Sequence, residues 1–174
     1  MKAVVVYESM FGNTERVAKA IAAGMADGVE AVAVEVSTLP NVEDAQLVVV
    51  GGPTHAFSMS RETTRSDARS RGRGAVVSQT GIREWIASAV LPRAGLVATF
   101  DTRIRRPRLP GSAAKAAMKH LRRAGATPLT APTSFWVDGT TGPLLDGELD
   151  RARAWGQELA TALLAERRAI VEPR

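Results

Sequence analysis

The chain has 174 residues, of which 45% are hydrophobic and 24% charged, with a net charge of +5 and no cysteine. This composition is typical of a globular protein with a sizeable core and excludes a fibrous or wholly disordered chain. Without cysteine there can be no disulfide, thiolate nucleophile or thiolate metal site. The amino-terminal apolar run is too short for a signal peptide, and no stretch is long enough for a membrane helix, so we expect a cytoplasmic protein.

Short apolar runs alternate with helical patterns along the chain. Strands are predicted at 3–7, 32–36, 46–50, 96–100 and 129–137, and apolar residues at helical spacing predict helices around 17–25, 82–90, 114–121 and 149–163. This alternation implies parallel βαβ units, and therefore a doubly wound three-layer α/β sandwich with five strands. We expect a single domain over residues 1–170, with residues 61–74 as an Arg-rich loop or helix insertion.

Most of the positive charge lies in two segments. Residues 61–74 hold five arginines against two acids, and residues 101–108 hold four arginines against one. A basic protein raises nucleic acid as a partner, but these segments lack interleaved aromatic residues, which argues against it. Arg61, Arg65 and Arg69 would share one face of a helix, and a solvated face or a loop is the simplest interpretation.

The sequence Ser-Met-Phe-Gly-Asn-Thr at 9–14 follows the first predicted strand directly and opens the first helix. Backbone N–H groups, hydroxyls and the helix dipole would converge there, as in a phosphate site. Alternatively, Ser9 and Asn13 only cap the helix. The loop lacks the lysine of a P-loop and the three glycines of a dinucleotide site, so a mononucleotide is the expected ligand. Ligands bind at the carboxyl ends of such strands, so the other loops of interest are 51–60, 101–111 and 138–143.

Residues 9–14 resemble the phosphate loop of the flavodoxin family, whose pattern is Ser/Thr-x-Ser/Thr-Gly-x-Thr. Gly51-Gly52-Pro53-Thr54-His55 and Phe100-Asp101-Thr102 resemble the two loops that flank the flavin. The resemblance covers nearly the whole chain and implies the strand order 2-1-3-4-5 with FMN as cofactor. Three features depart from the family: Phe11 replaces a hydroxyl residue, the flanking loops lack the usual Tyr or Trp pair, and residues 55–59 contain no glycine.

The resemblance also implies the cofactor-binding residues, without a catalytic residue or a metal ligand. Those of the phosphate loop are Ser9, Met10, Phe11, Gly12, Asn13 and Thr14, and those beside the flavin are Pro53, Thr54, His55, Ala56, Phe57, Phe100, Asp101 and Thr102. His55, Phe57 and Phe100 are the candidate walls of the flavin ring. Each aromatic residue has a structural alternative, because Phe100 ends an apolar strand and Phe57 could pack its loop onto the sheet.

The resemblance implies an FMN-binding electron-transfer protein. Two alternatives stay open: an FMN-dependent NAD(P)H:quinone or flavin reductase, and an interaction module of the same fold that does not bind FMN. Both arginine segments leave the same edge of the predicted sheet, so their charges should surround the site and attract an anionic partner. That partner could be an acidic redox protein, NAD(P)H or another phosphate-bearing substrate. Classical flavodoxins are acidic, so the opposite charge should raise the potential of the reduced flavin.

Overall fold

The computed structural model describes residues 1–55, 57–71, 80–93, 95–107 and 110–171. Its strands are β1 (Lys2–Tyr7), β2 (Glu30–Glu35), β3 (Leu47–Pro53), β4 (Leu96–Ile104), β5 (Thr127–Pro128) and β6 (Thr133–Val137). Its α-helices are α1 (Asn13–Gly24), α2 (Glu62–Arg71), α3 (Ile82–Ser88), α4 (Ala113–Arg123) and α5 (Glu148–Val171), and a short 3-10 helix spans Val36–Thr38.

All strands of the sheet are parallel, and their order confirms the predicted order 2-1-3-4-5. β2, β1, β3 and β4 are neighbours in that order, and the fifth position beside β4 is shared by two short strands. β5 pairs with the start of β4 and β6 with its end. The predicted strand at 129–137 therefore begins later, at Thr133. Pro128 and Pro132 have no N–H to donate, which accounts for the interruption between the two pieces.

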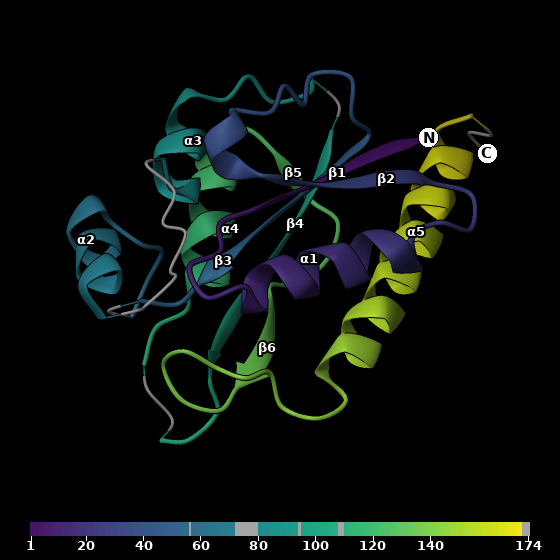
Figure 1. Ribbon diagram of the computed structural model, residues 1–174. Helices are drawn as coiled ribbons and strands as arrows, with labels where there is room; N and C mark the ends of the chain where they lie inside the picture. Colours follow the sequence, from purple (N-terminus) through teal and green to yellow (C-terminus); the bar gives the residue numbers. More distant parts are fainter. Residues whose placement is uncertain (56, 72–79, 94, 108–109, 172–174) are drawn as a thin grey trace.

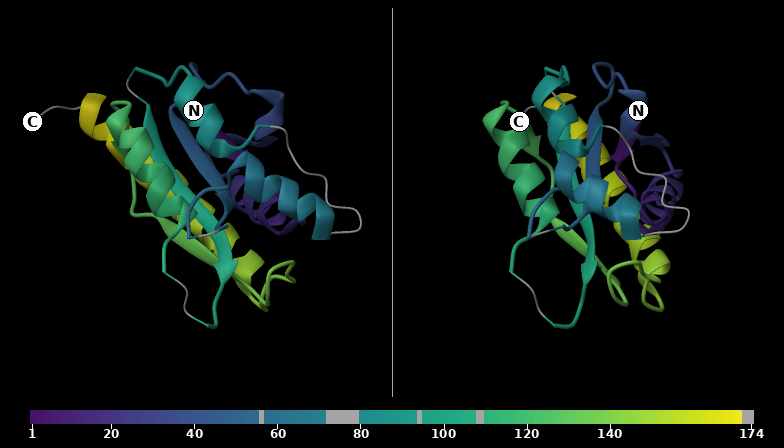
Figure 2. Two further views of the ribbon diagram at one scale, coloured as in Figure 1. Left: turned by 90° about the vertical axis from the view of Figure 1, so that its left-hand side faces the viewer. Right: turned by 60° about the vertical axis from the view of Figure 1, so that its left-hand side comes forward.

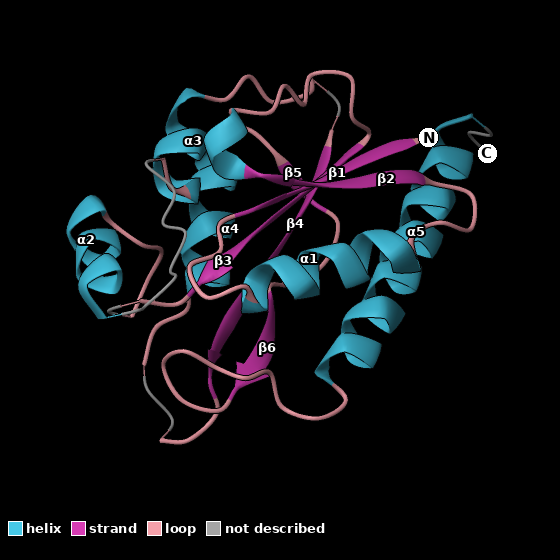
Figure 3. Ribbon diagram, in the orientation of Figure 1, coloured by secondary structure: helices cyan, strands magenta, loops and turns pink. Residues whose placement is uncertain are grey.

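Helices cover both faces of the sheet, as the three-layer prediction requires (Figures 1 and 3). Along β1, Ala3, Val5 and Tyr7 pack into the cluster that includes residues of α1 and α5. Val4 and Val6 point to the other face, where α3 and α4 lie. This alternation is the period of two that a strand buried on both faces requires. None of the helices within the described ranges is long and apolar enough to cross a membrane.

The carboxyl ends of the strands meet at one edge of the sheet because all the strands are parallel. The loops after β1, β3, β4 and β6 leave from this edge, and Figure 2 shows the loops after β4 and β6 extending beyond it. α2 follows β3 and lies to the side of the three layers (Figure 1). The fold therefore brings the four predicted ligand loops to one place.

Candidate functional site

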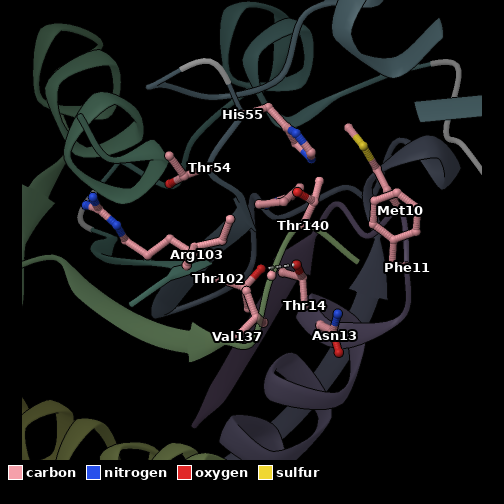
Figure 4. A pocket seen from close by; sticks show the side chains of 13 residues that line it. Met10, Phe11, Asn13, Thr14, Thr54, His55, Thr102, Arg103, Val137 and Thr140 are labelled. Carbon is pink, nitrogen blue, oxygen red and sulfur yellow. Dashed lines mark hydrogen bonds between the residues drawn. The ribbon is translucent and has the colours of Figure 1, made fainter. Parts of the chain in front are cut away.

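A pocket of about 60 Å³ opens between the loops at the carboxyl edge (Figure 4). Its lining comes from the ends of β3, β4 and β6 and from the start of α1 with the loop before it. The lining residues are Met10, Phe11, Asn13, Thr14, Pro53, Thr54, His55, Thr102, Arg103, Ile104, Val137, Gly139 and Thr140. The first eight of these are among the predicted cofactor-binding residues, so the structure brings most of the predicted set together.

The loop before α1 leaves donors open at the start of this helix. Gly12 has a φ of 80°, a left-handed conformation that favours glycine, and no side chain caps the helix end. The Ser9 hydroxyl is buried and has no hydrogen-bond partner within the described ranges. The Asn13 amide donates instead to the Thr141 carbonyl oxygen, at 3.0 Å. The alternative in which Ser9 and Asn13 cap the helix is therefore wrong, and the uncapped start of α1 lies at the pocket, which Asn13 and Thr14 line.

Contacts between loops fix the geometry of the pocket. The Thr14 and Thr102 hydroxyl oxygens lie 2.8 Å apart in a buried hydrogen bond that joins α1 to the end of β4. On the other side, the loop after β6 packs on Asn13 so closely that a Cβ at Gly142 would lie 2.3 Å from the Asn13 amide nitrogen. The start of α1 is thus held by two other loops.

Asp101 orders two loops but does not line the pocket. Its side chain is completely buried, and one carboxylate oxygen accepts hydrogen bonds from the Thr54 hydroxyl (2.9 Å), the Ser112 hydroxyl (2.5 Å) and the Ala114 N–H (3.1 Å). A carboxylate at the start of α4 also suits the helix dipole. Asp101 therefore connects the ends of β3 and β4 with α4, in a supporting position.

Phe100 belongs to the core. It is fully buried, and its ring makes edge-on contacts with Phe135 and Trp155, at centroid distances of 6.0 Å and 6.4 Å. Phe100 is thus a core residue at the end of an apolar strand, which was the alternative to a role as a flavin wall. Its ring lies on the α1 and α5 side of the sheet and does not line the pocket.

His55 closes a tight turn beside the pocket. The His55 N–H donates to the Ser58 carbonyl oxygen and the Ser58 N–H donates back, at 2.9 Å and 3.0 Å. Within this turn, Phe57 has a φ of 70° and a 55% exposed side chain, and it is not among the pocket residues; Ala56 lies outside the described residues. The buried Nε2 atom of His55 has no partner among the described groups, and burial lowers the pKa of this imidazole. Burial therefore favours the neutral imidazole, and its Nε2 atom is a buried polar atom of a residue that lines the pocket.

The predicted cofactor-binding set did not include five lining residues, which are Arg103, Ile104, Val137, Gly139 and Thr140. Arg103 had been considered only as part of a charged surround. Ile104 and Val137 follow from strand register, because they lie opposite each other where β4 and β6 end. Gly139 and Thr140 lie in the 138–143 loop, which the predicted fold had already indicated as a ligand loop.

A buried polar cluster begins at Glu8, directly before the 9–14 loop. Glu8 is 1% exposed and accepts hydrogen bonds from the Ser60 hydroxyl and the Ile82 N–H. Arg65 is 3% exposed and donates to Ser60 (3.0 Å) and Glu84 (3.1 Å). Desolvation raises the pKa of Glu8, although these hydrogen bonds and Arg65 act in the opposite direction.

The prediction of a solvated face for Arg65 is wrong, because its guanidinium enters this cluster. For the rest of the Arg-rich segment, the side chain of Arg69, residues 72–74 and likewise Arg108 lie outside what the structure describes. Within the described ranges, no group of three or more His, Asp or Glu side chains could hold a metal ion.

Comparison with known proteins gives one family match and many structural ones. Residues 5–70 match the family model described as flavodoxin. A comparison with curated proteins gave no match. A flavodoxin from the domain Archaea is 21% identical with a TM-score of 0.65, over 94% of this chain and 99% of that one. Oxidised flavodoxin 1 from Bacillus cereus is 17% identical with a TM-score of 0.66, over 92% and 98%.

Larger proteins contain the same fold as one part. Rubredoxin oxygen:oxidoreductase from Desulfovibrio gigas is 19% identical with a TM-score of 0.63, over 95% of this chain but only 37% of that one. At these identities the structural matches establish the fold, and the family match adds the sequence pattern of β1 to α2. The chain therefore has a flavodoxin-like fold over nearly its whole length, and residues 5–70 also match the sequence model of the flavodoxin family.

Proposed function

We propose that the protein binds FMN noncovalently and transfers electrons through it. One observation is the main support: the buried Ser9 hydroxyl without a partner lies beside the uncapped start of α1, where Gly12 turns the chain. A phosphate group would accept hydrogen bonds from this hydroxyl and from the first N–H groups of the helix. The proposed phosphate site is therefore the 9–14 loop, as the resemblance implies.

The remaining lining residues suit the rest of the cofactor. Met10 and Phe11 lie on one side of the pocket and His55 points into it from the turn after β3 (Figure 4). An apolar wall with a few polar atoms is the usual environment of a bound ring system. The volume of about 60 Å³ suits the phosphate end, so the ring would lie at the open rim. FMN would supply the electron transfer, and the chain would hold, orient and partly shield it.

The neutral imidazole of His55 is proposed to contact a polar edge of the flavin. Its Nε2 atom is buried and otherwise unpartnered, which costs free energy until a ligand satisfies it. Asp101 is proposed to act only through the loops that it connects, and Phe100 only through its place in the core.

The reductase alternative gains support from a second cavity beside the pocket, which is lined in part by Arg105 and Arg106. The interaction module is favoured instead by Phe11, which stands where the family has a hydroxyl residue. We propose an anionic redox partner, either a protein or NAD(P)H.

Titration with FMN tests the proposal, with flavin fluorescence as the readout and Ser9→Ala as the diagnostic variant. We expect quenched, micromolar or tighter binding, weakened about tenfold or more in S9A, because a hydrogen bond to a charged group contributes about 1.5–3 kcal/mol. Ser88→Ala is the matched control, since Ser88 is exposed at the end of α3, at the opposite edge of the sheet. Absence of binding at tens of micromolar would favour the interaction module, and equal affinities of S9A and S88A would refute the phosphate site.

A further inference from the structure

A second cavity, of about 340 Å³, adjoins the pocket at the carboxyl edge. Its lining residues are Arg105, Arg106, Val137, Asp138 and Leu145. Val137 also lines the first pocket, so the two spaces meet at the end of β6. The cavity therefore lies where a molecule could contact a group bound in the first pocket.

The strand register explains why these residues meet. Ile104 lies opposite Val137 in the last pair of the β4–β6 ladder, so Arg105 and Arg106 leave the sheet beside Asp138. The chain after β6 then folds back, because the Asp138 N–H donates to Pro143 (2.8 Å) and the Leu145 N–H to Trp136 (3.0 Å). This return places Leu145 beside Val137. The lining thus combines the buried Val137 and the half-buried Leu145 with three exposed charged residues.

Neither arginine in this lining forms an ion pair within the part of the chain that the structure describes. The four ion pairs among the described residues lie elsewhere, and none involves Arg105 or Arg106. Both arginines and Asp138 are exposed, so the lining has an excess of one positive charge. Guanidinium groups match the geometry of phosphate and carboxylate, to which they can donate two hydrogen bonds each.

We infer that this cavity binds the phosphate or carboxylate group of a small organic anion whose apolar part lies on Val137 and Leu145. The volume is in the range of small-molecule sites, roughly 300–1,000 Å³, and the concave shape suits a small ligand. A protein partner would instead need a patch of about 800 Å² on each side. The anion's role as an electron donor or acceptor rests on the proposed function, whereas its binding does not require FMN.

Calorimetric titration tests this inference with three probes of one ring system: 2-naphthyl phosphate, 2-naphthoate and the neutral 2-naphthalenemethanol. We expect the protein to prefer at least one of the anions to the alcohol. The double variant Arg105→Gln/Arg106→Gln should lose about tenfold in affinity for the preferred anion, because two charge-assisted contacts are removed. Asp138→Asn should act in the opposite direction and tighten binding about twofold to threefold, since it removes a like charge. Comparison of the two anions identifies the preferred group.

The matched control is Arg122→Gln/Arg123→Gln, which removes the same charge from the carboxyl end of α4. Both of these arginines are exposed and lie at the opposite edge of the sheet, because α4 runs antiparallel to the strands. Equal losses in the two double variants, or no preference for either anion over the alcohol, would overturn the inference. Each titration is made with and without FMN. Binding of the anion by a protein that does not bind FMN would therefore refute the proposed function and retain the cavity assignment.

Discussion

Glu8 places a carboxylate in the core directly before the 9–14 loop, the proposed phosphate site. It is 1% exposed, and its hydrogen bonds to Ser60 and Ile82 connect the end of β1 with the segments around α2 and α3. Burial nevertheless raises its pKa above the ordinary value, because desolvation outweighs these bonds and the nearby Arg65. The protein therefore retains an ionisable group where its charge is costly.

This shift predicts a pH-dependent stability. In the unfolded chain Glu8 ionises near pH 4.5, whereas the folded protein holds the proton to a higher pH. The folded state binds more protons between the two pKa values, so the free energy of unfolding falls as pH rises through this window. Glu8→Gln removes the effect. Relative to the wild type, we expect E8Q to gain stability as pH rises above about 4.5, by ~1.4 kcal/mol for each unit of the shift.

Urea unfolding of wild type and E8Q between pH 4 and pH 8 measures this difference. Glu84 does not obscure it. Desolvation acts to raise the pKa of Glu84, but hydrogen bonds, including that from Arg65, outweigh desolvation, so the pKa of Glu84 is lowered. Glu84 therefore adds stability as pH rises, but only in a window below its ordinary pKa. A stability difference between wild type and E8Q that stays constant above pH 4.5 would contradict the prediction.

Residue roles at the site could be predicted only in part from the sequence. The Gly12 turn and the convergence of Thr14, Thr54 and His55 follow from loop position, because a parallel sheet brings these loops to one edge. Sequence position does not give the direction of a side chain at a strand end. Phe100 and Asp101 therefore could not be told apart from pocket residues, and the burial of Arg65 depends on Glu84, a contact across 19 residues.

At the scale of elements, α1 and α5 approach each other closely through two glycines. A Cβ at Gly156 would lie 2.2 Å from the Ile21 carbonyl oxygen, and one at Gly24 would lie 2.0 Å from the Arg153 carbonyl oxygen. Both positions are contacts between helix backbones, so no side chain can move to make room. This contact holds α1, and with it the 9–14 loop at its start, against the long α5 helix.

Gly156→Ala should therefore destabilise the protein. Helix propensity alone would give a gain of ~0.5–1 kcal/mol for alanine. Overpacking a close contact costs ~1–3 kcal/mol, so we expect a net loss of roughly 1–2 kcal/mol in the free energy of unfolding. Ala154→Gly is the control, because Ala154 is exposed on the same helix and reports propensity only. Stabilisation by G156A would show that the helices separate without cost.

The elements themselves were largely predictable, because each one has its own apolar pattern. The four early strands and the helices α1, α3, α4 and α5 occur where the patterns indicated. β4 continues four residues beyond the predicted end at Phe100, since its polar end pairs with β3 and β6. The split of the last strand into β5 and β6 depends on pairing with β4, which a pattern of hydrophobicity does not contain.

For the whole molecule, the relevant property is the charge at the carboxyl edge. Arg103 lines the pocket, and Arg105 and Arg106 line the cavity beside it, against the single carboxylate of Asp138 in these linings. The described part of the Arg-rich segment adds less than its composition suggested, because Arg65 is paired with Glu84. Among the described residues, the positive charge of these linings therefore comes from the end of β4 and the loop after it.

This field should shift the reduction potential of FMN bound at the proposed site in a salt-dependent way. Positive charges favour the anionic reduced flavin over the neutral oxidised form, and a unit charge ~10 Å away contributes ~0.4 kcal/mol in water, or ~18 mV for one electron. Salt screens exposed charges, so a potentiometric titration should show the potential falling by roughly 20–40 mV between about 0.02 M and about 0.5 M KCl. R105Q/R106Q should have a lower potential at low salt and a flatter dependence, whereas R122Q/R123Q should follow the wild type. A potential that rises with salt would mean that carboxylates, rather than these arginines, determine the field at the flavin.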